Sequence, residues 1–216
     1  MESSHPEFNI ISAARPRAGY PDRVKKSAAK TPEETEIKIS VEGAAKTRAL
    51  LRASGFRILK RRVFEQNIVL DDPAGSLKAR NLLLRVRTAG KIVTCTFKGQ
   101  EIPGIHKRRE EREFHADNLE ECLALFRGIG YTPSLRYEKY RTEFSREADP
   151  GVATLDETPI GIFMELEGPS RWIDRTAKEL GFSRADYVPF SYSRLFSMWC
   201  AARGIESNAM TFSRRR

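Results

Sequence analysis

The stretch Glu34-Thr35-Glu36-Ile37-Lys38 decides the fold, because it alternates charged and uncharged residues over one short segment. In a β-strand, successive side chains point to opposite faces of the sheet. Glu34, Glu36 and Lys38 therefore share one face, and Thr35 and Ile37 share the other. This segment predicts a strand whose charged face and apolar face lie in different environments.

The same alternation recurs in five later segments, so the charged face is a property of the whole sheet. The only departure is near residue 110, where Glu110 and Arg112 are charged on the opposite face. An antiparallel sheet with one hydrated face would also produce this pattern. A closed barrel is favoured because the charged residues are almost all Glu, Arg or Lys and recur in six segments. The later members of this set are Arg85, Arg87, Lys98, Arg109, Glu111, Glu113, Lys139, Arg141, Glu165 and Glu167.

Helical patterns separate the predicted strands and can cover an apolar outer surface. We expect helices over residues 43–54, 118–128, 171–180 and 191–203. Asp117 is the predicted N-cap of the second helix, with Glu120 at the capping-box position. The sequence therefore predicts an α+β fold, in which an antiparallel β tunnel has its charges inside and its helices outside.

A tunnel of this kind would enclose seven basic and six acidic side chains. Burying so many ions is costly unless they are paired or hydrated, so we expect a polar cavity that binds a ligand. The basic groups suit a polyanion, and arginine guanidinium groups match phosphate oxygens particularly well. Clustered carboxylates suit the hard cations Mg²⁺ or Mn²⁺. The combination predicts a site for a metal ion and a polyphosphate.

Length and composition set the remaining expectations. The chain has 216 residues and a net charge of 38 − 29 = +9. It contains no apolar run of the ~18 residues that a membrane helix needs, and its N-terminus lacks a secretory h-region. Three widely spaced cysteines argue against a disulfide scaffold, so we expect a cytoplasmic protein. We expect a disordered, proline-containing leader over 1–33, one domain over 34–204 and a basic tail over 205–216.

Six motifs, in order, resemble the CYTH, or triphosphate tunnel metalloenzyme, superfamily. The first is Glu34-Thr35-Glu36-Ile37-Lys38, which matches the family's ExExK signature, and the resemblance extends over residues 34–200 or so. It implies a closed eight-stranded antiparallel tunnel with helices packed outside. The later motifs are Leu84-Arg85-Val86-Arg87, Thr96-Phe97-Lys98-Gly99, Arg109-Glu110-Glu111-Arg112-Glu113, Lys139-Tyr140-Arg141 and Glu165-Leu166-Glu167.

The resemblance also implies roles for individual residues. Glu34, Glu36, Lys38 and Asp156 would form the catalytic set, and Glu111 and Glu113 would orient basic residues or bind a second metal. The implied metal ligands, for Mg²⁺ or Mn²⁺, are Glu34, Glu36, Glu165 and Glu167. The implied triphosphate ligands are Lys38, Arg85, Arg87, Lys98, Arg109, Lys139 and Arg141.

The expected activity is metal-dependent hydrolysis of a triphosphate such as tripolyphosphate, ATP or thiamine triphosphate. The alternatives are a class IV adenylate cyclase, which converts ATP to cyclic AMP and pyrophosphate, and a non-catalytic polyphosphate- or nucleotide-binding module. The histidine-containing segment that precedes ExExK in established cyclases is replaced here by Thr31-Pro32-Glu33, which favours hydrolysis. A nucleic-acid partner is not expected, because the charged faces of the predicted strands carry no aromatic side chains. A homodimer is left open.

Overall fold

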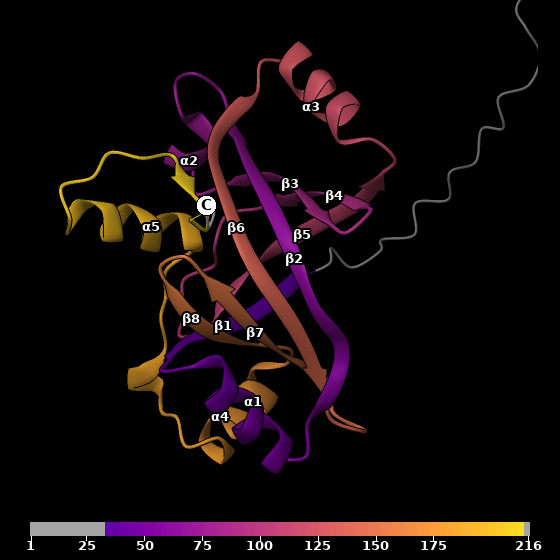
Figure 1. The fold of residues 1–216 in the computed structure, drawn as a ribbon, viewed down its shortest axis with the longest axis vertical. Helices are drawn as coiled ribbons and strands as arrows, with labels where there is room; N and C mark the ends of the chain where they lie inside the picture. The colour runs from indigo at the N-terminus through magenta and orange to yellow at the C-terminus, as the bar shows by residue number, and fades with distance from the viewer. Residues whose placement is uncertain (1–32, 214–216) are drawn as a thin grey trace, which may run out of the picture. The chain divides into compact units, whose positions relative to one another are not determined.

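The computed structural model describes residues 33–213, so the predicted leader lies outside the described residues apart from Glu33. Figure 1 shows the elements in order. The strands are β1 (Glu33–Val41), β2 (Arg57–Asp71), β3 (Leu83–Ala89), β4 (Ile92–Lys98), β5 (Lys107–Ala116), β6 (Thr132–Ser145), β7 (Val152–Thr158), β8 (Gly161–Glu167) and β9 (Ala209–Met210). The helices are α1 (Ala44–Ala53), α2 (Ser76–Ala79), α3 (Leu119–Gly128), α4 (Ser170–Glu179) and α5 (Tyr192–Ala201), with a 3₁₀ turn at Arg184–Asp186.

The sheet closes on itself as a barrel. Its strand order is β2-β3-β4-β5-β1-β8-β7-β6, and β6 pairs with β2 to complete the circle. All of these pairings are antiparallel. Closure leaves each strand with an inner and an outer face, which is the arrangement predicted from the alternation. The predicted α+β fold, a closed eight-stranded antiparallel tunnel, is therefore confirmed within residues 33–213.

The helices pack on the outer face of the barrel, where the apolar side chains of the strands point. Helices α1 and α4 lie at one end of the long strands, and α3 lies toward the other end (Figure 1). Ile37 and Leu166 of the barrel form one apolar core with Ile173 of α4 and Leu51 of α1. A second core contains Val86, Cys95 and Phe126 of α3, and a third contains residues of α5. Burial of these apolar side chains on the outside keeps the charged residues inside.

The capping residue of α3 differs from the prediction. Asn118, and not Asp117, is the N-cap, and its side-chain oxygen accepts hydrogen bonds from the backbone amides of Glu120 and Glu121. Asparagine and aspartate cap helices about equally well, so the residue type does not select between adjacent positions. The extended backbone of Asn118 places its side chain over the first turn.

The C-terminal segment contributes a short strand. Ala209 and Met210 form β9, which pairs in parallel with β6. The backbone amide of Phe212 donates a hydrogen bond to Glu138, and its ring lies 5.3 Å from that of Tyr140. Within the region expected to be a basic tail, residues 209–212 thus contact the barrel, and residues 214–216 lie outside the described residues. None of the helices in residues 33–213 has the length and apolar character needed to cross a membrane.

Candidate functional site

A cavity of about 580 Å³ lies in the barrel, within the size range of small-molecule sites. The thirteen side chains that the alternation places inside the tunnel all line this cavity: Glu34, Glu36, Lys38, Arg85, Arg87, Lys98, Arg109, Glu111, Glu113, Lys139, Arg141, Glu165 and Glu167. Their individual roles remain predictions.

The deepest part of the site is a group of buried ion pairs centred on Asp156, which is fully buried. Arg141 donates two hydrogen bonds to its carboxylate, at 2.7 and 2.6 Å, and Lys139 donates one at 2.9 Å. The hydroxyl of Tyr192, from α5, donates another at 2.7 Å. Burial opposes ionisation, but Arg141 and Lys139 outweigh it and lower the pKa of Asp156. Asp156 does not line the cavity itself. It forms hydrogen bonds with Arg141 and Lys139, which do line the cavity.

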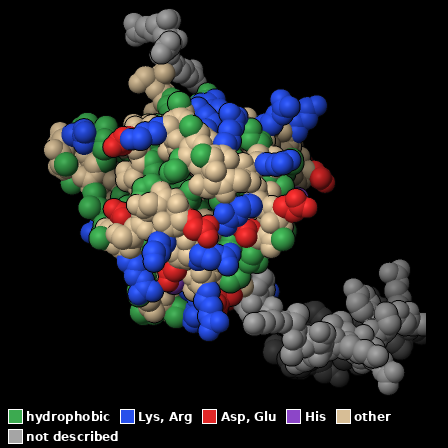
Figure 2. Space-filling view, turned by 90° about the horizontal axis from the view of Figure 1, so that it is seen from below, with side chains coloured by type: hydrophobic (Ala, Val, Ile, Leu, Met, Phe, Trp, Pro, Cys, Tyr) green, Lys and Arg blue, Asp and Glu red, His purple; other side chains and the backbone are tan. Residues whose placement is uncertain are grey.

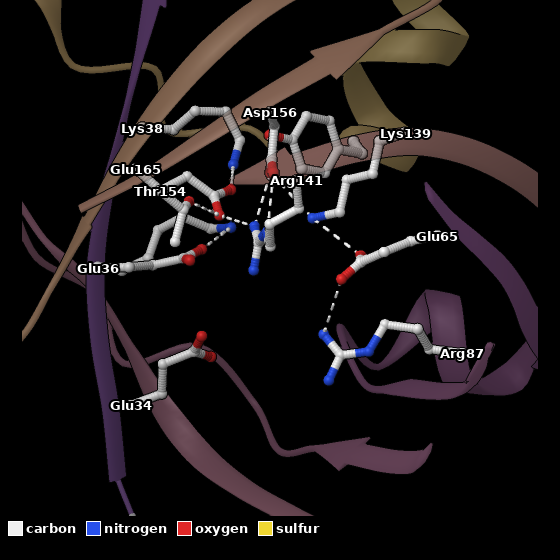
Figure 3. Close-up of polar contacts among 12 residues, drawn as sticks. Glu34, Glu36, Lys38, Glu65, Arg87, Lys139, Arg141, Thr154, Asp156 and Glu165 are labelled. Carbon is white, nitrogen blue, oxygen red and sulfur yellow. Dashed lines mark hydrogen bonds and ion pairs between the residues drawn. The ribbon is translucent and has the colours of Figure 1, made fainter. Parts of the chain in front are cut away.

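Glu165 belongs to the same buried group. It accepts hydrogen bonds from Lys38 and from Arg141, as Figure 3 shows. Although burial alone would raise its pKa, Lys38 and Arg141 hold the pKa of Glu165 well below its usual range. Strand pairing explains the contact, since Lys38 on β1 lies directly opposite Glu165 on β8. The carboxylate is therefore ionised and already fully engaged by basic groups.

Four other glutamates form a second group, which we name the carboxylate cluster: Glu34, Glu36, Glu111 and Glu167. Glu34 and Glu111 both contact the amine of Lys98. Burial and the neighbouring carboxyl group of Glu34 raise the pKa of Glu111 to about 7. Lys98 outweighs burial at Glu34 and lowers its pKa to about 2. Two neighbouring carboxyl groups thus have pKa values shifted in opposite directions.

Glu167 is the least compensated member of the carboxylate cluster. Glu167 is exposed at the end of β8, but desolvation of its carboxyl group in the cavity, followed by the charge of Glu34, raises its pKa to about 7. Its neighbour across the strands is Glu36, whose carboxylate lies 3.2 Å from the amine of Lys107. Within residues 33–213, Glu167 has no ion pair, in contrast to Glu165, which pairs with Lys38 and Arg141.

Arg85 and Arg87 on β3 form a third group with looser contacts. Arg87 lies 3.8 Å from Glu65 and 3.7 Å from Glu113, beyond hydrogen-bond distance. Arg85 donates to Tyr137 at 3.3 Å and to Thr96 at 3.1 Å, but its buried Nε has no partner within the described residues. These guanidinium groups retain donors that an anionic ligand could use.

The structure brings in several cavity residues that the sequence analysis did not select. Lys107 and Tyr137 line the cavity, and so does Tyr192. Tyr137 corrects the expectation that the charged faces carry no aromatic side chain, because it shares the inner face of β6 with Lys139. Glu65 lies 3.6 Å from Lys139 and is buried on β2. The sequence signal that could have identified Glu65 is the two-residue spacing of Glu65, Asn67 and Val69, which places them on one face of β2.

The carboxylate cluster fits a hard divalent cation in its donor chemistry. Carboxylate oxygens are the protein ligands that Mg²⁺ and Mn²⁺ prefer, and a cation would favour the ionised forms of Glu111 and Glu167, whose pKa is raised by burial and by neighbouring carboxylates. Within residues 33–213, no three Asp, Glu, His or Cys side chains converge into a complete metal site. Mg²⁺ commonly binds through one or two carboxylates, with water and substrate phosphates as its other ligands.

Similar proteins come from several organisms. A protein of Methanocaldococcus jannaschii described as a "putative adenylate cyclase" is 28% identical over 134 residues, which cover 62% of this chain and 75% of that protein. A solved Pyrococcus horikoshii structure has a TM-score of 0.66 at 22% identity, covering 77% of this chain and 99% of its own.

A Hippeastrum protein superposes with a TM-score of 0.59 at 19% identity, covering 77% of this chain and 96% of its own. It is described as a "putative adenylyl cyclase" with a "dominant" triphosphatase activity. These structural likenesses support the fold. The sequence model of the CYTH domain matches residues 32–192, and the chain therefore belongs to the CYTH domain family.

Proposed function

We propose that this protein is a divalent-metal-dependent enzyme that hydrolyses the terminal phosphate of a triphosphate. One observation supports the proposal: a single cavity combines arginines that have loose ion pairs with a carboxylate cluster whose member Glu167 has no ion pair within residues 33–213. A site for anions alone would not need the carboxylates, and a site for cations alone would not need the arginines. CYTH proteins include triphosphatase and adenylate cyclase-like enzymes, which is consistent with this combination.

The basic residues would bind the phosphate chain. Arg87 and Arg85 offer guanidinium donors from β3, and Lys98 and Arg109 lie on the neighbouring strands β4 and β5. Lys38, Lys139 and Arg141 are held in place by Glu165 and Asp156, so their positions are established before a ligand arrives. Preorganised donors stabilise charge in a transition state without a reorganisation cost.

The carboxylate cluster would hold the metal. Glu34, Glu36 and Glu167 would supply oxygen ligands, and Glu111 would help to position Lys98, which it contacts at 2.9 Å. When bound, the ion neutralises phosphate charge and activates or orients the attacking water. Hydrolysis would then yield a diphosphate and phosphate.

A second candidate is an adenylate cyclase, because part of the cavity wall is not charged. Val69, Leu83 and Tyr137 line it together with Ser191 and Tyr192 at the start of α5. Such a wall suits the base or another organic part of a substrate. In this case the ribose 3′-hydroxyl would attack the α-phosphorus and release pyrophosphate.

Product analysis tests both candidates. Tripolyphosphate, ATP and thiamine triphosphate would be offered separately with Mg²⁺ or Mn²⁺, and phosphate, pyrophosphate and cyclic AMP would be measured. Phosphate release that stops on addition of a chelator supports the triphosphatase. Cyclic AMP with equimolar pyrophosphate supports the cyclase instead. Absence of turnover for all three substrates would contradict both proposals.

A further inference from the structure

Lys107 lines the cavity and pairs with Glu36 of the carboxylate cluster. Its amine lies 3.2 Å from the carboxylate of Glu36, and the two residues are directly opposite each other on β5 and β1. Both are more than nine-tenths buried. On its other side Glu36 is paired in register with Glu167 of β8. Glu36 therefore has an ammonium group on one flank and a carboxylate on the other.

A metal ion held by Glu36 and Glu167 would compete with this ammonium group. Both are cations, and both would use the carboxylate of Glu36. Within residues 33–213, Lys107 has no other ion pair, so displacement from Glu36 would leave a buried amine without a partner. An unpaired buried charge is strongly unfavourable. Metal binding alone would therefore be opposed by Lys107.

An anionic ligand in the same cavity would remove this opposition. Lys107 lines the cavity, and its four-carbon side chain can redirect the amine without movement of the strand. Arg109, two residues later on the same face of β5, also lines it. A phosphate oxygen near these residues would replace the carboxylate as the partner of Lys107.

We propose that Lys107 couples the two ligands, pairing with Glu36 in the empty site and with a phosphate oxygen when metal is bound. This inference rests on the proposed function, because it assumes a site for both ligands. It predicts positive cooperativity: metal and polyphosphate each bind more tightly in the presence of the other. Lys107 is in this view a ligand-binding residue that exchanges Glu36 for a phosphate oxygen as its partner.

Binding measurements on the full chain test the coupling without relying on turnover. Mn²⁺ binding alone would be followed from the spin-resonance signal of the free ion. A non-hydrolysable imido analogue of tripolyphosphate would be titrated by calorimetry, first with chelator and then with excess Mn²⁺. The variant is Lys107→Met, with Lys107→Gln if the methionine variant does not fold. Arg108→Met is the matched control, since Arg108 is the exposed neighbour that pairs with Glu33.

In Lys107→Met we expect Mn²⁺ alone to bind about tenfold more tightly, the scale of one charged hydrogen bond. The analogue should bind about tenfold more weakly in excess Mn²⁺ but nearly unchanged in chelator. Lys107→Arg should restore part of the coupling, and Arg108→Met should behave as wild type. Equal effects of Lys107→Met with and without metal would overturn the inference. If wild-type protein bound neither ligand, the proposed function itself would fail.

Discussion

Glu165 and Glu167 lie two residues apart on the same face of β8, yet their carboxyl groups have opposite pKa shifts. Lys38 and Arg141 contact Glu165 and hold its pKa well below the usual range, against the effect of burial. Burial and the charge of Glu34 raise the pKa of Glu167 to about 7. One carboxylate is thus part of the structural ion-pair group, and the other remains available to a cation.

Replacing these two glutamates should therefore have different effects on stability. Glu165→Gln would leave Lys38 buried without its counter-ion and should lower the free energy of unfolding by about 3–5 kcal/mol. Glu167→Gln removes a carboxylate that resists ionisation and should be neutral or stabilising at pH 8. Urea denaturation of both variants in chelator measures the difference, and equal losses would contradict the distinction.

Turnover should depend on Glu167 in spite of its small structural role. We expect Glu167→Gln to lower metal-dependent turnover by about 100-fold, the scale of losing one preorganised electrostatic contact. The measurement is phosphate release at saturating Mg²⁺ or Mn²⁺. Wild-type turnover in this variant would remove Glu167 from the metal site.

Stability should also depend on pH through Glu167. Its pKa is about 7 in the folded protein and near 4.5 in the unfolded chain, so the folded state retains the proton longer. Stability from this group therefore falls as pH rises from about 4.5 to about 7 and is constant above. Relative to wild type, Glu167→Gln should gain stability over this interval. Unfolding measured in chelator at pH 5, 6, 7 and 8 checks this prediction for both proteins. The same pH dependence of the free energy of unfolding in wild type and in Glu167→Gln would refute it.

Arg87 should contribute to ligand binding more than to folding. Its contacts with Glu65 and Glu113 are 3.8 and 3.7 Å, too long for hydrogen bonds. Arg87→Ala should leave the melting temperature of the unliganded protein nearly unchanged. Wild-type protein at a hundredfold excess of ligand over its Kd should gain about 2.7 kcal/mol, and the variant less. Thermal melts with and without the imido analogue and Mg²⁺ test this, and an equal ligand shift in the variant would exclude Arg87 from binding.

Asp156 should act through the residues that it holds. Asp156→Asn would remove the counter-charge of Lys139 and Arg141 and should cost about 3–5 kcal/mol of stability. Glu157→Gln is a matched control, because Glu157 pairs with Arg62 at 2.9 Å on the partly exposed outer side. We expect the control to change stability by about 1 kcal/mol or less. Similar unfolding midpoints for the two variants would contradict the structural role of Asp156.

The alternation in the sequence was sufficient to predict the inner face of six strands. Glu34, Glu36 and Lys38 all line the cavity, because the two-residue period of a strand leaves no other arrangement once one face is apolar. β2 was harder to interpret. Its pairing with β6 shifts register between Ile58 and Val63, and apolar residues occur on both of its faces, so Glu65 was not identified.

The sequence by itself determined which side chains are inside, but the tertiary structure decided what each of them does there. Lys38 and Glu165 are 127 residues apart and meet only because β1 pairs with β8 in one register. Glu36 meets Lys107 through the pairing of β1 with β5. Alternation within a strand is a local property of the backbone. The partner of a charge depends on strand order and register, which are set by closure of the whole barrel and by packing of its apolar exterior.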